Sequence, residues 1–138
     1  MNKVTAVLVI FLLPVSCTNN VECDLCGEWK SNAELTLPEM EASTKLTDKQ
    51  RNLFRSNFYG KLVVETNETM SRGYFPDENP NEVTWGPWKV LSKDKNRIIT
   101  STQLPNSETW MEHTIVTHGK CYEVVQENLG FSEWFCRK

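Results

Sequence analysis

The stretch TWMEHTIVTHGKCYEVVQENLGFSEWFCR, residues 109–137, decides the fold. It contains three strand-like segments, 109–116, 120–126 and 131–137, which are rich in β-branched and aromatic residues. Typical turn residues separate them: His118-Gly119 first, then Asn128-Leu129-Gly130. Short strands joined by such turns form antiparallel hairpins, so this stretch predicts three consecutive antiparallel strands.

The same pattern continues toward the N-terminus. A first strand is expected over Gly27–Leu37, because Trp29, Leu35 and neighbours alternate with polar residues until Pro38. Four further strands are expected at Lys61–Thr66, Thr69–Phe75, Thr84–Leu91 and Arg97–Gln103. The total is eight short strands, each in hairpin connection to the next. This arrangement is typical of a mainly β sandwich or an up-and-down barrel.

One short helix is expected between the first and second strands. Thr47 and Gln50 form a capping-box pattern, and Asp48 lies in the first turn, where the helix dipole favours a carboxylate. Leu53, Phe54 and Phe58 follow at helical spacing, and the segment ends at Gly60.

The N-terminus has the pattern of an export signal. Lys3 precedes an almost entirely apolar run from Val4 through Val15, which is shorter than the roughly 20 residues that span a bilayer. Ser16-Cys17 resembles the cleavage site of a bacterial lipoprotein, although Pro14 departs from that pattern. We expect residues 1–17 to be a signal peptide, with Cys17 retained as a lipidated N-terminus, and residues 18–138 to form one domain. The mature protein is expected in the cell envelope, lipid-anchored or periplasmic, or alternatively secreted.

Composition excludes some classes of partner. The chain has 15 basic and 18 acidic residues, for a net charge of −3, and no run rich in Lys and Arg. Nucleic-acid binding is therefore not expected.

The cysteines predict structural disulfides. Setting Cys17 aside leaves Cys23, Cys26, Cys121 and Cys136, an even number in an exported chain. Four cysteines allow three pairings. The Cys23-x-x-Cys26 spacing also occurs in redox and zinc sites, but it runs into a strand and has no second C-x-x-C. Neither a metal nor a cofactor is expected.

Two short signals resemble the lipocalin-like (calycin) group. The Gly27-Glu28-Trp29 sequence begins the first expected strand, and Arg137 ends the last. In that group the Trp lies across the closed end of an eight-stranded barrel, and an Arg packs over its ring. The resemblance implies this fold here, with Gly27, Trp29 and Arg137 as the structural signature.

The resemblance also bears on the disulfides and the helix. Closure of a barrel would place Cys23 or Cys26 near Cys136, which would staple the two ends of the chain. The alternative is Cys23–Cys26 together with a cross-strand Cys121–Cys136. The helix would either cover the open end as a lid or merely flank the barrel.

The candidate site is a hydrophobic pocket rather than a catalytic centre. His113 and His118 lie five residues apart, so they point to opposite faces of a strand and are interpreted as surface histidines. Gly86-Pro87 indicates a bulge or an edge position that would splay Trp85 and Trp88 to different faces. The residues predicted to bind a ligand are aromatic: Phe54, Phe58, Tyr74, Trp85, Trp88 and Trp110.

These features predict a non-catalytic envelope protein that holds a small hydrophobic ligand inside the barrel, since the sequence shows no nucleophile or nucleotide motif. The alternative is a protein-interaction module of the envelope, an inhibitor or stress-related lipoprotein, with a filled barrel. A cavity would favour the first hypothesis and a packed interior the second.

Overall fold

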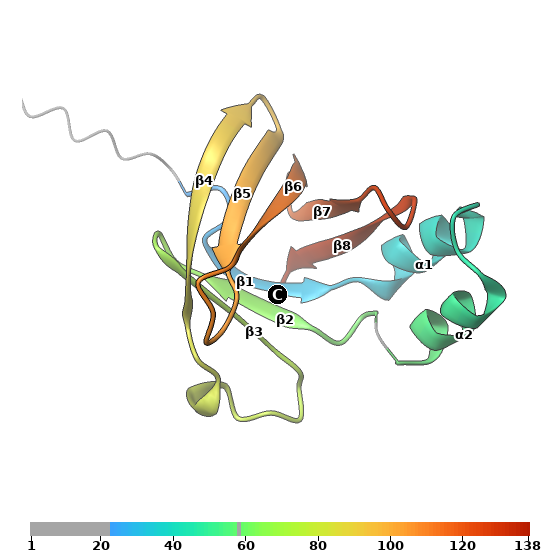
Figure 1. The fold of residues 1–138 in the computed structure, drawn as a ribbon, viewed down its shortest axis with the longest axis horizontal. Helices are drawn as coiled ribbons and strands as arrows, with labels where there is room; N and C mark the ends of the chain where they lie inside the picture. Colours follow the sequence, from blue (N-terminus) through green and yellow to red (C-terminus); the bar gives the residue numbers. More distant parts are fainter. Residues whose placement is uncertain (1–22, 58) are drawn as a thin grey trace, which may run out of the picture.

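The computed structural model describes residues 23–57 and 59–138, which form a closed, all-antiparallel barrel of eight strands in the order β1 to β8 (Figure 1). The predicted eight-stranded up-and-down barrel is therefore confirmed. The signal peptide, Cys17 and Phe58 lie outside the described residues. The strands are β1 Gly27–Ser31, β2 Val63–Thr66, β3 Met70–Tyr74, β4 Gly86–Asp94, β5 Arg97–Gln103, β6 Trp110–His118, β7 Cys121–Gln126 and β8 Phe131–Arg137. The helices are α1 Ala33–Ala42, α2 Asp48–Asn57 and a short 3-10 turn, η1, Pro80–Glu82.

The cross-strand register sets which side chains face inward. Trp29 of β1 is paired with Val64 of β2 on one side and with Arg137 of β8 on the other. Because residues directly opposite each other point to the same face, this ladder defines the barrel interior. The buried core consists of Leu25, Trp29, Trp88, Ile98, Ile115, Tyr122 and Phe135.

The first expected strand is wrong beyond Ser31, because α1 begins at Ala33 and includes Pro38. The Asn32 side chain caps this helix by accepting a hydrogen bond from the Leu35 backbone N–H. The expected Gly27–Leu37 strand is thus a five-residue strand followed directly by a helix. An additional helix, not predicted, precedes the expected one.

Helix α1 takes the place of a strand beside the first half of β8. The Trp134 N–H donates to Thr36 Oγ1 at 2.9 Å, and the Ser132 N–H donates to a Glu39 carboxylate oxygen at 3.1 Å. The Trp134 carbonyl accepts from the Asn32 N–H. Side chains of α1 therefore satisfy backbone groups that β1 no longer reaches.

Helix α2 confirms the predicted helix and its capping box, with Thr47 and Gln50 hydrogen-bonded to each other. A second core lies under the two helices and consists of Met40, Leu46 and Phe131, with Leu37, Phe54, Tyr59 and Leu129 packed against it. Figure 1 shows both helices at one side of the barrel. In residues 23–57 and 59–138, no helix is long and apolar enough to cross a membrane.

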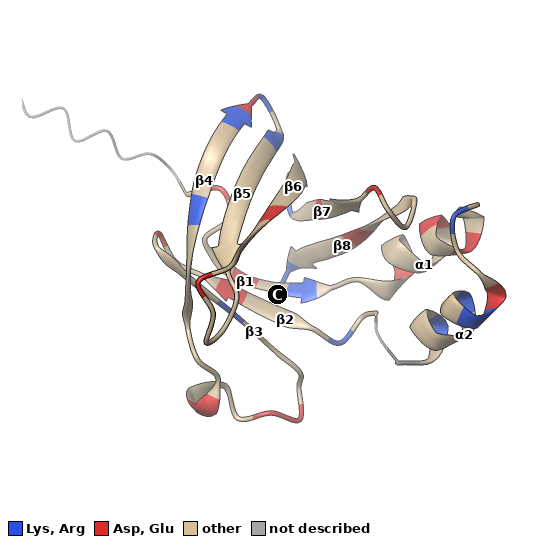
Figure 2. Cartoon of the chain, viewed as in Figure 1, with Lys and Arg blue, Asp and Glu red and all other residues tan. Residues whose placement is uncertain are grey.

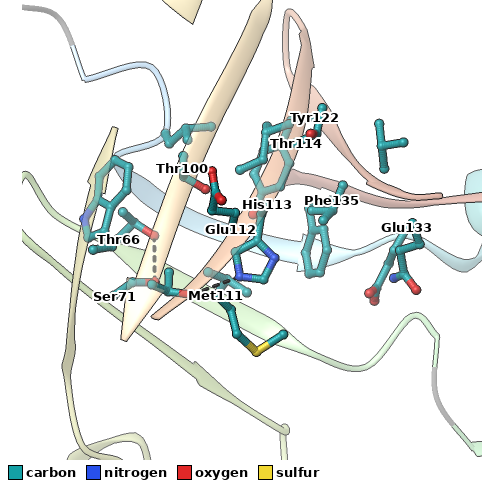
Figure 3. Close-up of a pocket in the computed structure, with 18 of the residues that line it drawn as sticks. Thr66, Ser71, Thr100, Met111, Glu112, His113, Thr114, Tyr122, Glu133 and Phe135 are labelled. Atoms are coloured by element: carbon teal, nitrogen blue, oxygen red, sulfur yellow. Dashed lines mark hydrogen bonds between the residues drawn. The ribbon is translucent and has the colours of Figure 1, made fainter. Parts of the chain in front are cut away.

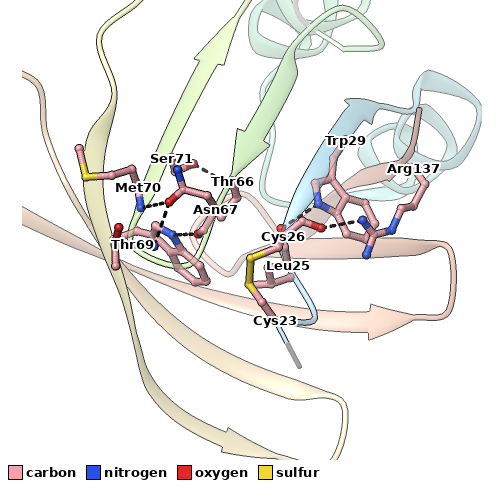
Figure 4. Close-up of a disulfide and its surroundings, with 11 residues drawn as sticks. Cys23, Leu25, Cys26, Trp29, Thr66, Asn67, Thr69, Met70, Ser71 and Arg137 are labelled. Atoms are coloured by element: carbon pink, nitrogen blue, oxygen red, sulfur yellow. Dashed lines mark hydrogen bonds between the residues drawn. A yellow bond between two sulfur atoms is a disulfide. The ribbon is translucent and has the colours of Figure 1, made fainter. Parts of the chain in front are cut away.

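The segment before β1 packs beside Trp29 and Arg137 (Figure 4). The guanidinium carbon of Arg137 lies 4.1 Å from the centroid of the Trp29 ring, which confirms the packing that the resemblance implied. The same guanidinium donates to the Cys26 carbonyl at 2.6 Å, and the Trp29 indole N–H donates to the Leu25 carbonyl. Gly27 has a φ of +118°, and a Cβ there would lie 2.4 Å from Arg137 Nη1.

The disulfides follow the alternative pairing. Cys23 is bonded to Cys26 and Cys121 to Cys136. The disulfide that would link Cys23 or Cys26 to Cys136 does not form, because Cys136 lies opposite Cys121 in the β7–β8 ladder and is bonded to it. Two disulfides are typical of proteins from oxidising, exported environments.

Candidate functional site

The barrel encloses a cavity of about 840 Å³ (Figure 3). Its lining includes consecutive residues of two neighbouring strands, 111–115 of β6 and 124–126 of β7, together with 127–129 of the β7–β8 turn. These strands are paired only from Thr114 and Val125 toward the β6–β7 turn, whereas β6 is paired with β5 as far as Trp110. The cavity therefore opens sideways, where the first half of β6 separates from β7.

The inner part of the cavity is apolar. Leu25, Ile115, Tyr122 and Phe135 belong both to the buried core and to the cavity lining. The rings of Tyr122 and Phe135 are stacked, with centroids 5.3 Å apart and an interplanar angle of 19°. This arrangement supplies an apolar and aromatic surface for a ligand body.

Hydroxyl groups and one imidazole line another part of the wall. Thr66 and Ser71 are hydrogen-bonded through their hydroxyls at 3.1 Å, and Thr102 Oγ1 lies 2.9 Å from His113 Nε2. Burial lowers the pKa of His113, so its ring is uncharged at neutral pH. The interpretation of His113 as a surface residue is therefore wrong, although His113 and His118 do point to opposite faces.

Glu133 places a carboxylate in the same cavity. It lies on β8, on the same face of the strand as Phe131 and Phe135, which are two residues before and after it. Its carboxylate accepts a hydrogen bond from Ser31 Oγ at 3.0 Å. Ser31 Oγ in turn accepts from the Gly60 N–H. Desolvation raises the pKa of Glu133, and the Ser31 hydrogen bond partly opposes that rise.

The charged groups of the lining have one sign. Three glutamates, Glu112, Glu127 and Glu133, line the cavity, and no Lys or Arg belongs to the lining among the described residues. Figure 2 shows acidic positions on β6, on the β7–β8 turn and on β8. Lys45 approaches this turn but donates to the Glu127 main-chain carbonyl and is not part of the lining.

No family model, curated protein or solved structure matches the chain. The site is therefore interpreted from its own geometry. In the part of the chain that the structure describes, no three His, Cys, Asp or Glu side chains are grouped so that they could hold a metal ion.

Of the aromatic residues predicted to bind a ligand, Trp88 lines the cavity, and its indole N–H donates to the Asn67 carbonyl at 2.7 Å. Phe54 lies in the core under the helices. Tyr74 and Trp85 lie beside Arg72, whose guanidinium carbon is 5.6 Å and 4.5 Å from their ring centroids.

Trp110 is 39% exposed, with the Lys89 ammonium 4.5 Å from its ring centroid. Phe54, Tyr74, Trp85 and Trp110 are therefore not brought together at the cavity. Of the bulge or edge position expected at Gly86-Pro87, the bulge does not lie there, because the register shift of β4 falls between Val90 and Ser92. Pro87 is paired with β3 alone.

The sequence interpretation missed His113 and Glu133. A signal for Glu133 existed, because strict alternation in FSEWFCR places it on the same face as Phe131 and Phe135. An ionisable residue in phase with buried aromatic residues is unusual in a β-strand and indicates a functional position.

Proposed function

We propose that this protein is a non-catalytic binding protein that holds a small molecule with a largely apolar body inside its barrel. The cavity of about 840 Å³ carries this proposal. Ligand sites in proteins have volumes of roughly 300–1,000 Å³ and are lined mostly by apolar side chains with a few polar groups. A filled barrel would have favoured the alternative, a protein-interaction module of the envelope.

The polar groups of the cavity support binding rather than catalysis. His113 is hydrogen-bonded to the Thr102 hydroxyl, and Glu133 to the Ser31 hydroxyl. His113 and Glu133 are thus each coupled to a neutral hydroxyl on a neighbouring strand rather than to a second acid or base.

The cellular setting belongs to the same proposal. The two disulfides support an oxidising compartment, and the sequence before Cys23 supports export with lipidation at Cys17. Native mass spectrometry of the protein purified from its own envelope tests both points. We expect an acylated Cys17 and a small-molecule adduct that is released on denaturation. An unacylated chain beginning at Thr18 would contradict the lipid anchor.

A cavity-filling variant tests the binding function directly. N-phenyl-1-naphthylamine, an uncharged probe whose fluorescence rises in apolar surroundings, is expected to bind the wild-type protein. Val124→Trp places an indole in the cavity, so we expect probe affinity to fall by about tenfold or more. Val116→Trp is the matched control, since Val116 lies on the neighbouring strand β6 and outside the cavity lining. Equal binding by all three folded proteins would refute the proposal.

A further inference from the structure

We propose that the preferred occupant of the cavity is a cationic amphipathic molecule, an apolar body with a protonated amine that lies against the Glu133 carboxylate. This inference rests on the proposed function and names the ligand class of the same site. The position of Glu133, the charge of the whole lining and the aromatic rings beside it support this inference.

Glu133 is a partly buried carboxylate that faces the cavity and has no cationic partner among the described residues. Among the described residues, the Ser31 hydroxyl donates the one hydrogen bond to its carboxylate, and no Lys, Arg or His side chain forms an ion pair with it. Other partly buried carboxylates of the barrel do have cationic partners. Glu65, for example, forms an ion pair with Arg72, with a nitrogen–oxygen distance of 2.5 Å. Buried charges in proteins are normally paired, so a ligand cation would complete this site.

The other charged residues of the lining are also negative. Glu112 lies on β6 and Glu127 in the β7–β8 turn, on opposite sides of the gap through which the cavity opens. The imidazole of His113 adds no positive charge, because burial keeps it neutral. A low-dielectric cavity with charges of one sign concentrates ligands of the opposite sign and disfavours a carboxylate or phosphate ligand.

The aromatic residues are compatible with the same head group. Phe135 follows Glu133 by two positions on β8, and Figure 3 shows the two side chains next to each other on the cavity side. The Tyr122 ring is stacked on Phe135. The faces of aromatic rings attract ammonium groups, and carboxylate and alcohol head groups do not gain this attraction. The apolar inner surface formed by Leu25 and Ile115 then receives the body of the ligand.

Three ligands with one alkyl chain and different head groups test this inference. Decylamine, decanol and decanoate are titrated at pH 7 against the wild-type protein loaded with N-phenyl-1-naphthylamine. We expect decylamine to displace the probe at concentrations about 10- to 100-fold lower than decanol, the range for a hydrogen bond to a charged group. Decanoate is expected to be the weakest competitor.

The variant Glu133→Gln keeps the shape of the side chain and removes its charge. We expect it to lose the preference for decylamine over decanol and to retain the probe. Glu123→Gln is the matched control, because Glu123 is paired with His118 outside the cavity lining and its substitution changes the net charge equally. Equal affinities for decylamine and decanol, or an unchanged preference in Glu133→Gln, would overturn the inference while probe binding still supports the binding function. If neither the probe nor decylamine binds, both proposals fail.

A pH titration of the wild-type protein keeps the test independent of that variant. Decylamine stays cationic from pH 7 to pH 4, so its affinity should fall as Glu133 is protonated, whereas that of decanol should stay constant. Other groups near Glu133 are Tyr59 and Tyr122, which remain protonated throughout, because burial and the nearby Glu133 carboxylate raise the pKa of each. Glu39 accepts hydrogen bonds from Ser132 and Trp134 beside it.

Glu112, Glu127 and His113 are the other ionisable groups of the cavity lining. A decylamine affinity that is unchanged between pH 7 and pH 4 would therefore overturn the inference.

Discussion

Substituting Gly27 by Ala tests the packing that closes the barrel. Gly27 has a φ of +118°, a conformation that residues with a side chain rarely adopt. The new Cβ would lie 2.4 Å from Arg137 Nη1, closer than any normal contact. The guanidinium must therefore shift, which disturbs its contact with the Trp29 ring and its hydrogen bond to the Cys26 carbonyl.

The expected loss of stability has two parts. Holding Ala at this φ costs about 1–3 kcal/mol of backbone strain. Moving Arg137 removes a cation–π contact of about 0.5–1 kcal/mol at an exposed site and a hydrogen bond of about 1 kcal/mol. We therefore expect Gly27→Ala to lower the free energy of unfolding by about 2.5–5 kcal/mol.

A double-mutant cycle separates the two parts. Urea unfolding followed by tryptophan fluorescence is measured for Gly27→Ala, Arg137→Ala and the double variant. With Arg137 removed, the Cβ meets no guanidinium, so the double variant should be less destabilised than the sum of the single variants by about 1 kcal/mol or more. Additive effects within about 0.5 kcal/mol, or a loss below about 1 kcal/mol for Gly27→Ala alone, would refute the reasoning.

Three further outcomes are expected. The pKa of Glu133 is raised in the folded protein, so its protonated form stabilises the fold at a pH below the ordinary glutamate pKa, and this stabilisation is lost as the pH rises through the folded-state pKa. The stability of Glu133→Gln relative to wild type should therefore increase between pH 4 and pH 8. Urea midpoints at the two pH values measure this gain, and a constant difference would contradict it. Replacing both Cys121 and Cys136 by Ala should lower the free energy of unfolding by about 3 kcal/mol, from the loss of a closed loop with a sequence separation of 15. Urea unfolding under non-reducing conditions checks this value, and a loss below about 1 kcal/mol would argue against it. The double variant Glu112→Gln/Glu127→Gln should slow decylamine association and weaken its dependence on salt, whereas a stopped-flow rate equal to that of wild type would exclude steering by the cavity mouth.

The strands were predictable wherever turn residues flank a segment in which apolar and polar residues alternate. Arg97–Gln103 and Phe131–Arg137 agree with the expected bounds, and the other strands after the helices differ by a few residues at their ends. The barrel followed from their number and short connections, since eight sequential hairpin strands are able to close on themselves.

The segment after Ser31 could not be predicted from its local pattern. Ala33, Leu35 and Leu37 alternate with polar residues as in a strand, and Pro38 is unfavourable inside a helix. The structure nevertheless has a helix there, because Thr36 and Glu39 bind backbone N–H groups of β8, about a hundred residues further along the chain. Contacts this distant in sequence override local propensity and leave no trace in a short window.

The candidate site was only partly predictable for a related reason. The count of aromatic residues indicated a pocket, yet which of them face it depends on strand register, and of the described ones only Trp88 does. Glu133 was identifiable from alternation alone, whereas the lateral opening depends on how far β6 and β7 stay paired.

The docking of α1 on β8 also has a consequence for the order of folding. Pairing of β1 with β8 joins the two ends of the barrel and is among the contacts most distant in sequence, so it is expected to form late. Until α1 docks, the N–H groups of Ser132 and Trp134 form an open sheet edge on which a second unfolded chain could add a strand. We therefore expect the hydroxyl of Thr36 and the carboxylate of Glu39 to limit self-association during folding, and their loss to appear first as a lower yield of soluble protein on refolding.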